Sequence, residues 1–167
     1  MAVAEIVGPR SAQPINGSWQ VACLPAGSAT DPVSLEASQP RWIACDGPMP
    51  VAAALVAAGE LHADQPKDLD ADDWWYRCQF ASDSASPVRM TFRGLATVAD
   101  VWLNGQLVLQ SESMFIAHTI DVSATIRARN ELVMRFRALA PLLAAKRPRP
   151  RWRTRLVSQQ TLRWYRT

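Results

Sequence analysis

The chain has 167 residues, of which 49% are hydrophobic and 20% are charged. This composition is typical of a folded globular protein, and the length fits one domain with a single core. No apolar run approaches the ~18–20 residues that a membrane-spanning helix needs, so an integral membrane protein is excluded. Residues 1–20 lack the continuous apolar block of a secretory signal, and a cytoplasmic location is therefore expected.

The charge is distributed unevenly along the chain. Residues 1–126 carry six basic and fourteen acidic side chains, whereas residues 127–167 carry twelve basic and one acidic side chain. The net charge of +3 therefore combines an acidic body with a basic C-terminal segment, and these two suit each other as intramolecular partners. Arginines interleaved with tryptophans can bind nucleic acid, but the acidic body argues against it, so no nucleic-acid partner is expected.

The cysteines and the aspartate cluster do not predict a metal or cofactor site. Cys23, Cys45 and Cys78 lie far apart without a Cys-x-x-Cys pair, and they are expected to be small buried thiols. Residues 64–73 contain five aspartates but lack the ordered spacing of a calcium loop, so a solvated acidic loop is expected. The glycines do not cluster into a phosphate-binding loop. We therefore expect neither a metal nor a cofactor.

The first part of the chain has few clear elements. Residues 19–24 predict a strand, which ends at the turn Pro25-Ala26-Gly27. Residues 52–61 are rich in alanine and predict one short helix with Gly59 near its end.

From Trp74 onward the apolar side chains recur with a period of two. The predicted strands are residues 74–80, 88–92, 98–103, 106–109 and 132–136. Alternation places apolar side chains against a core and polar ones toward water, while residues 98–103 are apolar on both faces except at Asp100 and so predict a more central strand. Asn104-Gly105 between two such runs is a strong signal for a tight hairpin. The expected fold is all-β, a jelly-roll β-sandwich with a short helical segment at 138–145 and an irregular basic tail.

The sequence contains no recognisable catalytic group. It lacks Gly-x-Ser-x-Gly, and its two histidines, His62 and His118, lie far apart. Trp74 and Trp75 leave two interpretations open. Their rings could stack on sugar faces, or, as neighbours on a strand, one could enter the core while the other covers its rim.

Four motifs in chain order carry a resemblance to a known family. They are Trp74-Trp75-Tyr76-Arg77 with Phe80, then Phe92-Arg93-Gly94-Leu95, then Val101-Trp102-Leu103-Asn104-Gly105, and finally Asn130-Glu131-Leu132. Together they resemble the N-terminal sugar-binding domain of family 2 glycoside hydrolases, which include β-galactosidases, β-glucuronidases and β-mannosidases. The resemblance covers roughly residues 70–137. The β-mannosidase-like branch is most similar, because an acidic stretch precedes the first motif and a long basic stretch follows the last.

The resemblance implies a domain organisation and a function. Residues 1–137 would form a galactose-binding-like jelly roll, and residues 138–167 a basic connection toward a catalytic (β/α)8 barrel. The chain would then be a fragment of a glycoside hydrolase, inactive by itself, because the family's catalytic glutamates lie in that barrel. Its expected partners are carbohydrate and the barrel of the same full-length chain. The alternative is a free-standing carbohydrate-binding module.

Six residues are expected to contact carbohydrate, and none is expected to be catalytic. They are Trp74, Trp75, Asp100, Gln160, Arg163 and Trp164. Gln160 and Trp164 are the nearest matches to a stretch that leads toward the active-site rim in the β-mannosidase-like branch. Ala96 stands where family members often carry Asp or Asn facing the sugar pocket.

Overall fold

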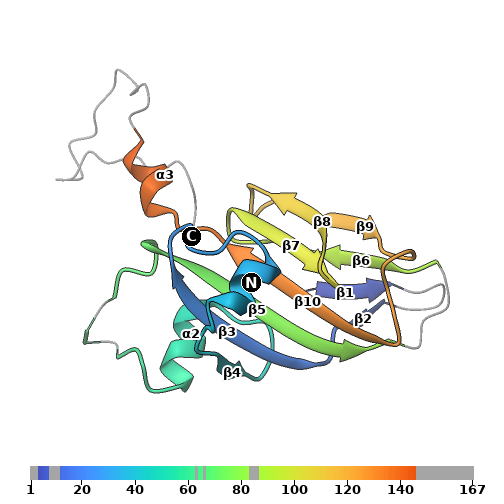
Figure 1. Cartoon of the computed structure of the whole chain (residues 1–167), viewed down its shortest axis with the longest axis horizontal. Coiled ribbons are helices and arrows are strands. Elements are labelled where there is room, and N and C mark those ends of the chain that lie inside the picture. Colours follow the sequence, from blue (N-terminus) through green and yellow to red (C-terminus); the bar gives the residue numbers. More distant parts are fainter. Residues whose placement is uncertain (1–3, 8–11, 63, 66, 83–86, 146–167) are drawn as a thin grey trace.

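The computed structural model describes residues 4–7, 12–62, 64–65, 67–82 and 87–145 (Figure 1). The elements of these residues are, in chain order, β1 (Ala4–Val7), β2 (Ala12–Pro14), β3 (Ser18–Pro25), α1 (Pro32–Ala37), β4 (Ile43–Cys45), α2 (Val51–Ala57), β5 (Asp72–Ala81), β6 (Arg89–Phe92), β7 (Ala99–Leu103), β8 (Gln106–Ser111), β9 (His118–Asp121), β10 (Arg129–Phe136) and α3 (Ala140–Ala144). None of the described helices is long and apolar enough to cross a membrane.

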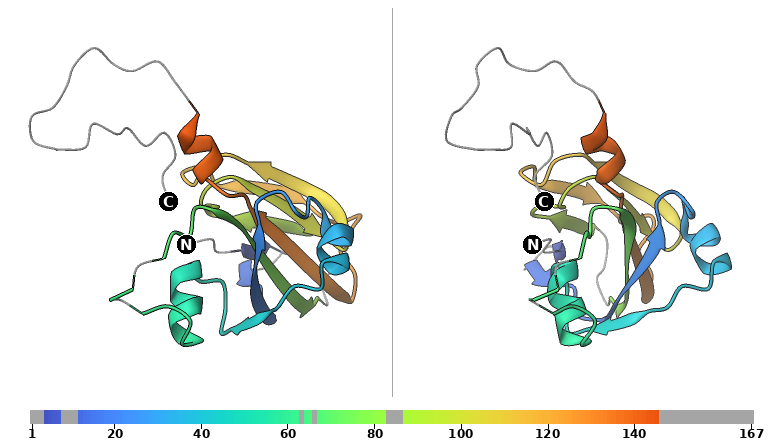
Figure 2. Two further views of the ribbon diagram at one scale, coloured as in Figure 1. Left: turned by 60° about the vertical axis from the view of Figure 1, so that its left-hand side comes forward. Right: turned by 90° about the vertical axis from the view of Figure 1, so that its left-hand side faces the viewer.

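The strands form two antiparallel sheets that pack into a sandwich. The short sheet has the order β2-β1-β6-β9, and the long sheet has the order β4-β3-β5-β10-β7-β8. Figures 1 and 2 show the two layers side by side, with α2 near one edge of the long sheet. The predicted all-β sandwich is thereby confirmed.

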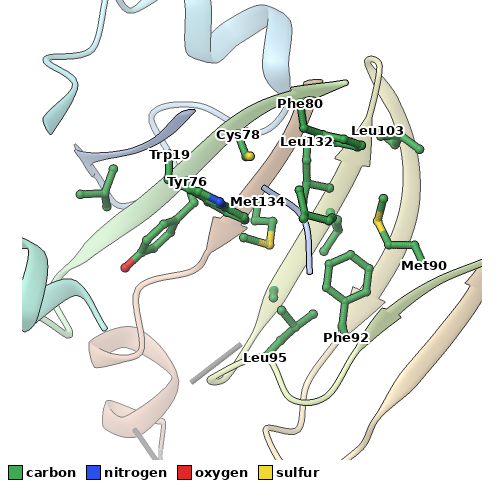
Figure 3. Packing of buried hydrophobic residues seen from close by; sticks show 14 of the residues in the cluster. Trp19, Tyr76, Cys78, Phe80, Met90, Phe92, Leu95, Leu103, Leu132 and Met134 are labelled. Atoms are coloured by element: carbon green, nitrogen blue, oxygen red, sulfur yellow. The ribbon is translucent and has the colours of Figure 1, made fainter. Parts of the chain in front are cut away.

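The core between the sheets follows from the predicted alternation. In β5, Tyr76 and Cys78 face the short sheet and lie opposite Met134 and Leu132 of β10. Figure 3 shows these side chains packing toward Phe92 and its neighbours on the short sheet. Full burial of each large apolar side chain contributes about 1.5–3 kcal/mol, so this core is the main source of stability.

The outer face of the long sheet differs from the prediction, because it is not simply open to water. Trp75 is completely buried and stacks on Trp102, with ring centroids 5.6 Å apart and planes inclined by 21°. Leu35 of α1 and Trp42 pack against this pair and cover it. The segment that contains α1 therefore forms a second, smaller cluster behind the sheet.

Several local predictions are confirmed at the level of the backbone. Asn104 and Gly105 have φ angles of 51° and 82°, as a tight hairpin between β7 and β8 requires. The predicted helix at 52–61 is α2, which is followed by Gly59 at φ 71°. The predicted helical segment at 138–145 contains α3.

Two expectations for polar residues were wrong. Cys23 is exposed, whereas Cys78 is buried and Cys45 is half-buried, so only part of the expected set of buried thiols is found. Asp73 does not lie in a solvated acidic loop, because it is the second residue of β5 and only 1% of its surface is exposed. The burial of Asp73 arises because β5 begins two residues earlier than its apolar pattern indicates.

Candidate functional site

A cavity of 340 Å³ opens at one end of the sandwich, where β5 begins and β10 ends. Its wall consists of Pro48, Met49, Pro50, Val51, Ala52, Leu69, Asp70, Asp72, Trp74, Tyr76, Ala96, Thr97, Met114, Met134, Phe136, Arg137 and Leu139. Most of these side chains are apolar, and they come from five separate segments between residues 48 and 139. The cavity continues the core that lies between the sheets.

Two aromatic side chains of β5 form the floor of the cavity, and their polar atoms already have partners. Trp74 Nε1 donates to the carbonyl of Leu69 at 2.9 Å, and Tyr76 Oη donates to the carbonyl of Met49 at 2.8 Å. Burial raises the pKa of the Tyr76 hydroxyl, so it stays protonated and remains a donor. These bonds fasten the loops before α2 and β5 to the cavity floor.

An ion pair on the outer face closes the same end of the sandwich. Arg135 donates to Asp73 Oδ2 from Nε at 3.0 Å and from Nη2 at 2.6 Å, and both side chains are buried. Asp73 also accepts the backbone N–H of Gly27 at 2.9 Å and that of Ala138 at 2.7 Å. One carboxylate thus joins the turn after β3 to the segment after β10.

Asp100, an expected carbohydrate contact, lies in a second ion pair beside the first. Arg137 donates to it from Nε at 2.7 Å and from Nη2 at 2.6 Å, and Gln110 Nε2 donates at 2.7 Å. Burial acts to raise the pKa of Asp100, but the hydrogen bonds from Arg137 and Gln110 outweigh it and lower the pKa overall. Asp100 therefore stays ionised and positions Arg137, which lines the cavity.

The remaining expected contacts fall into two groups. Trp75 is enclosed between Trp102 and the α1 segment, so its ring presents no face to a ligand in this structure. Gln160, Arg163 and Trp164 lie outside the described residues, and their roles stay predictions. Of the three expected contacts that the structure describes, Trp74 alone is found in the cavity wall. No group of three or more potential metal-ligating side chains occurs among the described residues.

The sequence did not single out several cavity residues that the structure brings together. Met49 and Met114 belong to loops, and Met134 and Phe136 were assigned to the core. No local pattern marks such residues, because a cavity wall assembled from five separate segments has no common spacing. Tyr76 could have been found, since it belongs to the first quoted motif and follows two tryptophans.

The comparison with known families agrees with the motifs and with the sandwich. The family described as glycosyl hydrolase 2 galactose-binding domain-like matches residues 29–166. The chain belongs to this family. The division into 1–137 and 138–167 stays a prediction.

The most similar proteins reported for this glycosyl hydrolase 2 domain include two fungal enzymes and one bacterial structure. The chain is 36% identical over 99 residues to β-mannosidase B of Aspergillus terreus, covering 52% of this chain and 12% of the relative. It is 41% identical over 68 residues to β-mannosidase B of Thermothelomyces thermophilus, covering 38% of this chain and 8% of the relative. The solved β-D-mannosidase of Dictyoglomus thermophilum gives a TM-score of 0.61 at 21% identity over 83% of this chain and 16% of that chain, which shows the fold. The chain therefore spans a small part of each of these proteins.

The asparagines of two of the motifs, Asn104 and Asn130, form hydrogen bonds that join neighbouring parts of the long sheet. Asn104 Nδ2 donates to Asn130 Oδ1 at 3.0 Å and to the carbonyl of Thr125 at 2.7 Å, and Asn104 Oδ1 accepts the N–H of Glu131 at 2.9 Å. Asn130 Nδ2 in turn donates to the carbonyl of Arg127 at 2.6 Å. These bonds fasten the β7–β8 hairpin to the start of β10, so both motifs have a structural explanation.

Proposed function

We propose that this chain is the non-catalytic N-terminal domain of a β-mannosidase-like family 2 glycoside hydrolase. In that enzyme it supports the catalytic barrel and forms part of the wall of the carbohydrate pocket. The observation that carries the proposal is the match of residues 29–166 to a galactose-binding-like domain, together with relatives of which the chain covers 12% or less. A cytoplasmic location is part of the same proposal.

The contacts of the buried carboxylates support a structural role, rather than a catalytic one, for this chain in the enzyme. Retaining glycoside hydrolysis needs two carboxyl groups about 5–5.5 Å apart, one of which must donate a proton while the other attacks the sugar. Asp73 and Asp100, the buried carboxylates of the described part, are each held by two nitrogens of an arginine. Carboxylate oxygens engaged in this way are not free to approach a substrate.

The proposal is tested by assaying two proteins with 4-nitrophenyl glycosides of β-mannose, β-galactose and β-glucuronic acid. The 167-residue chain should give no turnover above the buffer, whereas the product of a reading frame extended beyond codon 167 should hydrolyse the β-mannoside. Turnover by the chain alone that survives repurification, and that is lost on Asp72→Asn at the cavity wall, would contradict the proposal. An extended product with no glycosidase activity would contradict it as well.

A further inference from the structure

We propose that the cavity at the end of the sandwich, called here the docking socket, receives an apolar side chain from the catalytic part of the same enzyme and does not bind a sugar ring. The docking socket comprises the cavity-lining residues given above. The inference rests on the proposed function and adds to it the surface by which the domain attaches and the chemistry of what it receives.

The wall of the docking socket suits an apolar occupant. Met49, Met114 and Met134 line it, and flexible thioether side chains adapt to the shape of a partner group. A sugar ring would bring several hydroxyls, and burying a hydroxyl without a hydrogen-bond partner is unfavourable. The polar atoms of Trp74 and Tyr76 already donate to backbone carbonyls, and only 5% of Trp74 is exposed, which leaves little ring face for stacking.

The rim of the docking socket carries two exposed apolar side chains. Met114 lines the cavity, and the next two residues, Phe115 and Ile116, are 76% and 53% exposed. The loop that presents them is seated against Gly94, where a Cβ atom would lie 2.6 Å from the carbonyl oxygen of Met114. An apolar cavity bordered by exposed apolar side chains marks an interaction surface rather than ordinary protein surface.

The occupant is inferred from where the docking socket lies in the chain. Phe136, Arg137 and Leu139 line it, so it adjoins the segment that leads from β10 into α3 (Figure 2). The N–H of Ala140 donates to the carbonyl of Asp70 at 2.8 Å, which holds this segment beside the cavity. In the related β-mannosidases about nine-tenths of the protein lies outside the matched region, and a part that continues the chain beyond α3 would start from this end of the sandwich.

The charge of Arg137, a lining residue, is matched by Asp100. Together with the apolar lining, this pairing favours an aromatic or long aliphatic side chain as the group that enters.

The first experiment uses the 167-residue chain with indole as an apolar probe and methyl β-D-mannopyranoside as a sugar probe. Indole should shift the amide NMR signals of Met49, Val51 and Ala52 and of residues 134–139, and the sugar should not. Ala52→Trp fills the docking socket from α2 and should weaken indole binding by about tenfold. Ala53→Trp, on the same helix but exposed and outside the cavity wall, should leave it unchanged.

Three outcomes of this experiment would overturn the inference. One is no indole binding at the cavity amides, and another is sugar binding that Ala52→Trp abolishes. The third is indole binding that occurs only after residues 146–167 are removed, because the chain's own segment would then be the occupant. None of these results bears on whether the extended product is a glycosidase.

The second experiment compares hydrogen exchange in the chain and in the active extended product. The amides of Met49, Val51 and Ala52 and those of residues 113–116 should exchange about tenfold more slowly in the extended product. Ala52→Trp should remove this protection and Ala53→Trp should retain it. Equal exchange of these amides in both proteins would contradict the inference that the docking socket is the attachment surface, and it would leave the proposed function intact. An extended product without glycosidase activity overturns the proposed function, and the inference with it.

Discussion

Neighbouring residues of β5 lie in different environments, because the outer face of the long sheet is packed and the inner face borders a cavity. On the outer face, Asp73 and Trp75 are closed in by Arg135, by Trp102 and by the α1 segment. On the inner face, Trp74 lies at the wall of a cavity that the described residues leave open. The two adjacent tryptophans of one motif thus differ in surroundings rather than in type, because Trp74 borders a cavity and Trp75 lies within a packed cluster.

The largest expected effect comes from opening the outer face at its ion pair. Asp73→Asn leaves the buried guanidinium of Arg135 without its charge partner, which should lower the free energy of unfolding by about 3–5 kcal/mol. Urea denaturation followed by fluorescence measures the loss. The double variant Asp73→Leu/Arg135→Met removes both charges and should recover most of it. An unchanged urea midpoint for Asp73→Asn would show that the outer face is closed by apolar packing alone.

The second ion pair, Asp100–Arg137, should make the stability of the protein depend on pH. The pKa of Asp100 is lowered in the folded protein, so its stabilising contribution is complete above the ordinary value of 3.8 and is lost as the pH falls through the lower folded pKa. Asp100→Asn should cost about 1.5–3 kcal/mol at neutral pH, because the charged hydrogen bonds to Arg137 are lost. Urea midpoints measured from about pH 6 to pH 2.5 should fall less steeply in this variant than in the wild type. Parallel profiles would mean that Asp100 does not contribute to the acid sensitivity.

The assignment of residues to the two faces depends on strand register, and the β7–β8 hairpin tests it. A one-residue slip would exchange the inner and outer side chains of β7. Gly105→Ala should destabilise the protein by about 1–2 kcal/mol, because alanine resists the positive φ of 82° although no atom crowds the position. Gly47→Ala is the matched control, since Gly47 has equal space and no such φ. Equal thermal unfolding midpoints for both variants would contradict the idea that this turn sets the register of β7 and β8.

The smallest expected effect separates the two tryptophans directly. Trp74→Phe alters the wall of the docking socket and should change the affinity for indole by about two- to fivefold. Trp75→Phe changes a ring that is enclosed on the outer face and should leave that affinity unchanged. Titrations followed by amide NMR signals provide the comparison. Equal effects of both substitutions on the affinity for indole would mean that packing on the outer face also changes the cavity on the inner face.

Much of the long sheet could be predicted from the sequence, because its strands are long enough to show alternation. The strands β3, β5, β7, β8 and β10, the hairpin and α2 were all expected from local patterns. The strands β1, β2, β4 and β9 were not, since their three or four residues are held by ladder partners rather than by their own periodicity. A signal for α1 was present, because Asp31 caps the helix, Pro32 begins it and Ser34 completes the capping box.

The sequence by itself determined the fold class, the turn at Asn104-Gly105 and the family, because apolar alternation, a demand for positive φ and ordered motifs are all local properties of the chain. The tertiary structure alone decided which side chains are free to meet a partner. Asp73 and Arg135 are 62 residues apart, yet their pairing removes one predicted solvated aspartate from water. Trp75 is enclosed by a segment that no strand pattern marks, and the cavity beside Trp74 exists where five separate segments meet without filling the space between them. Such outcomes depend on packing between distant residues, and the spacing of residues along the chain does not encode them.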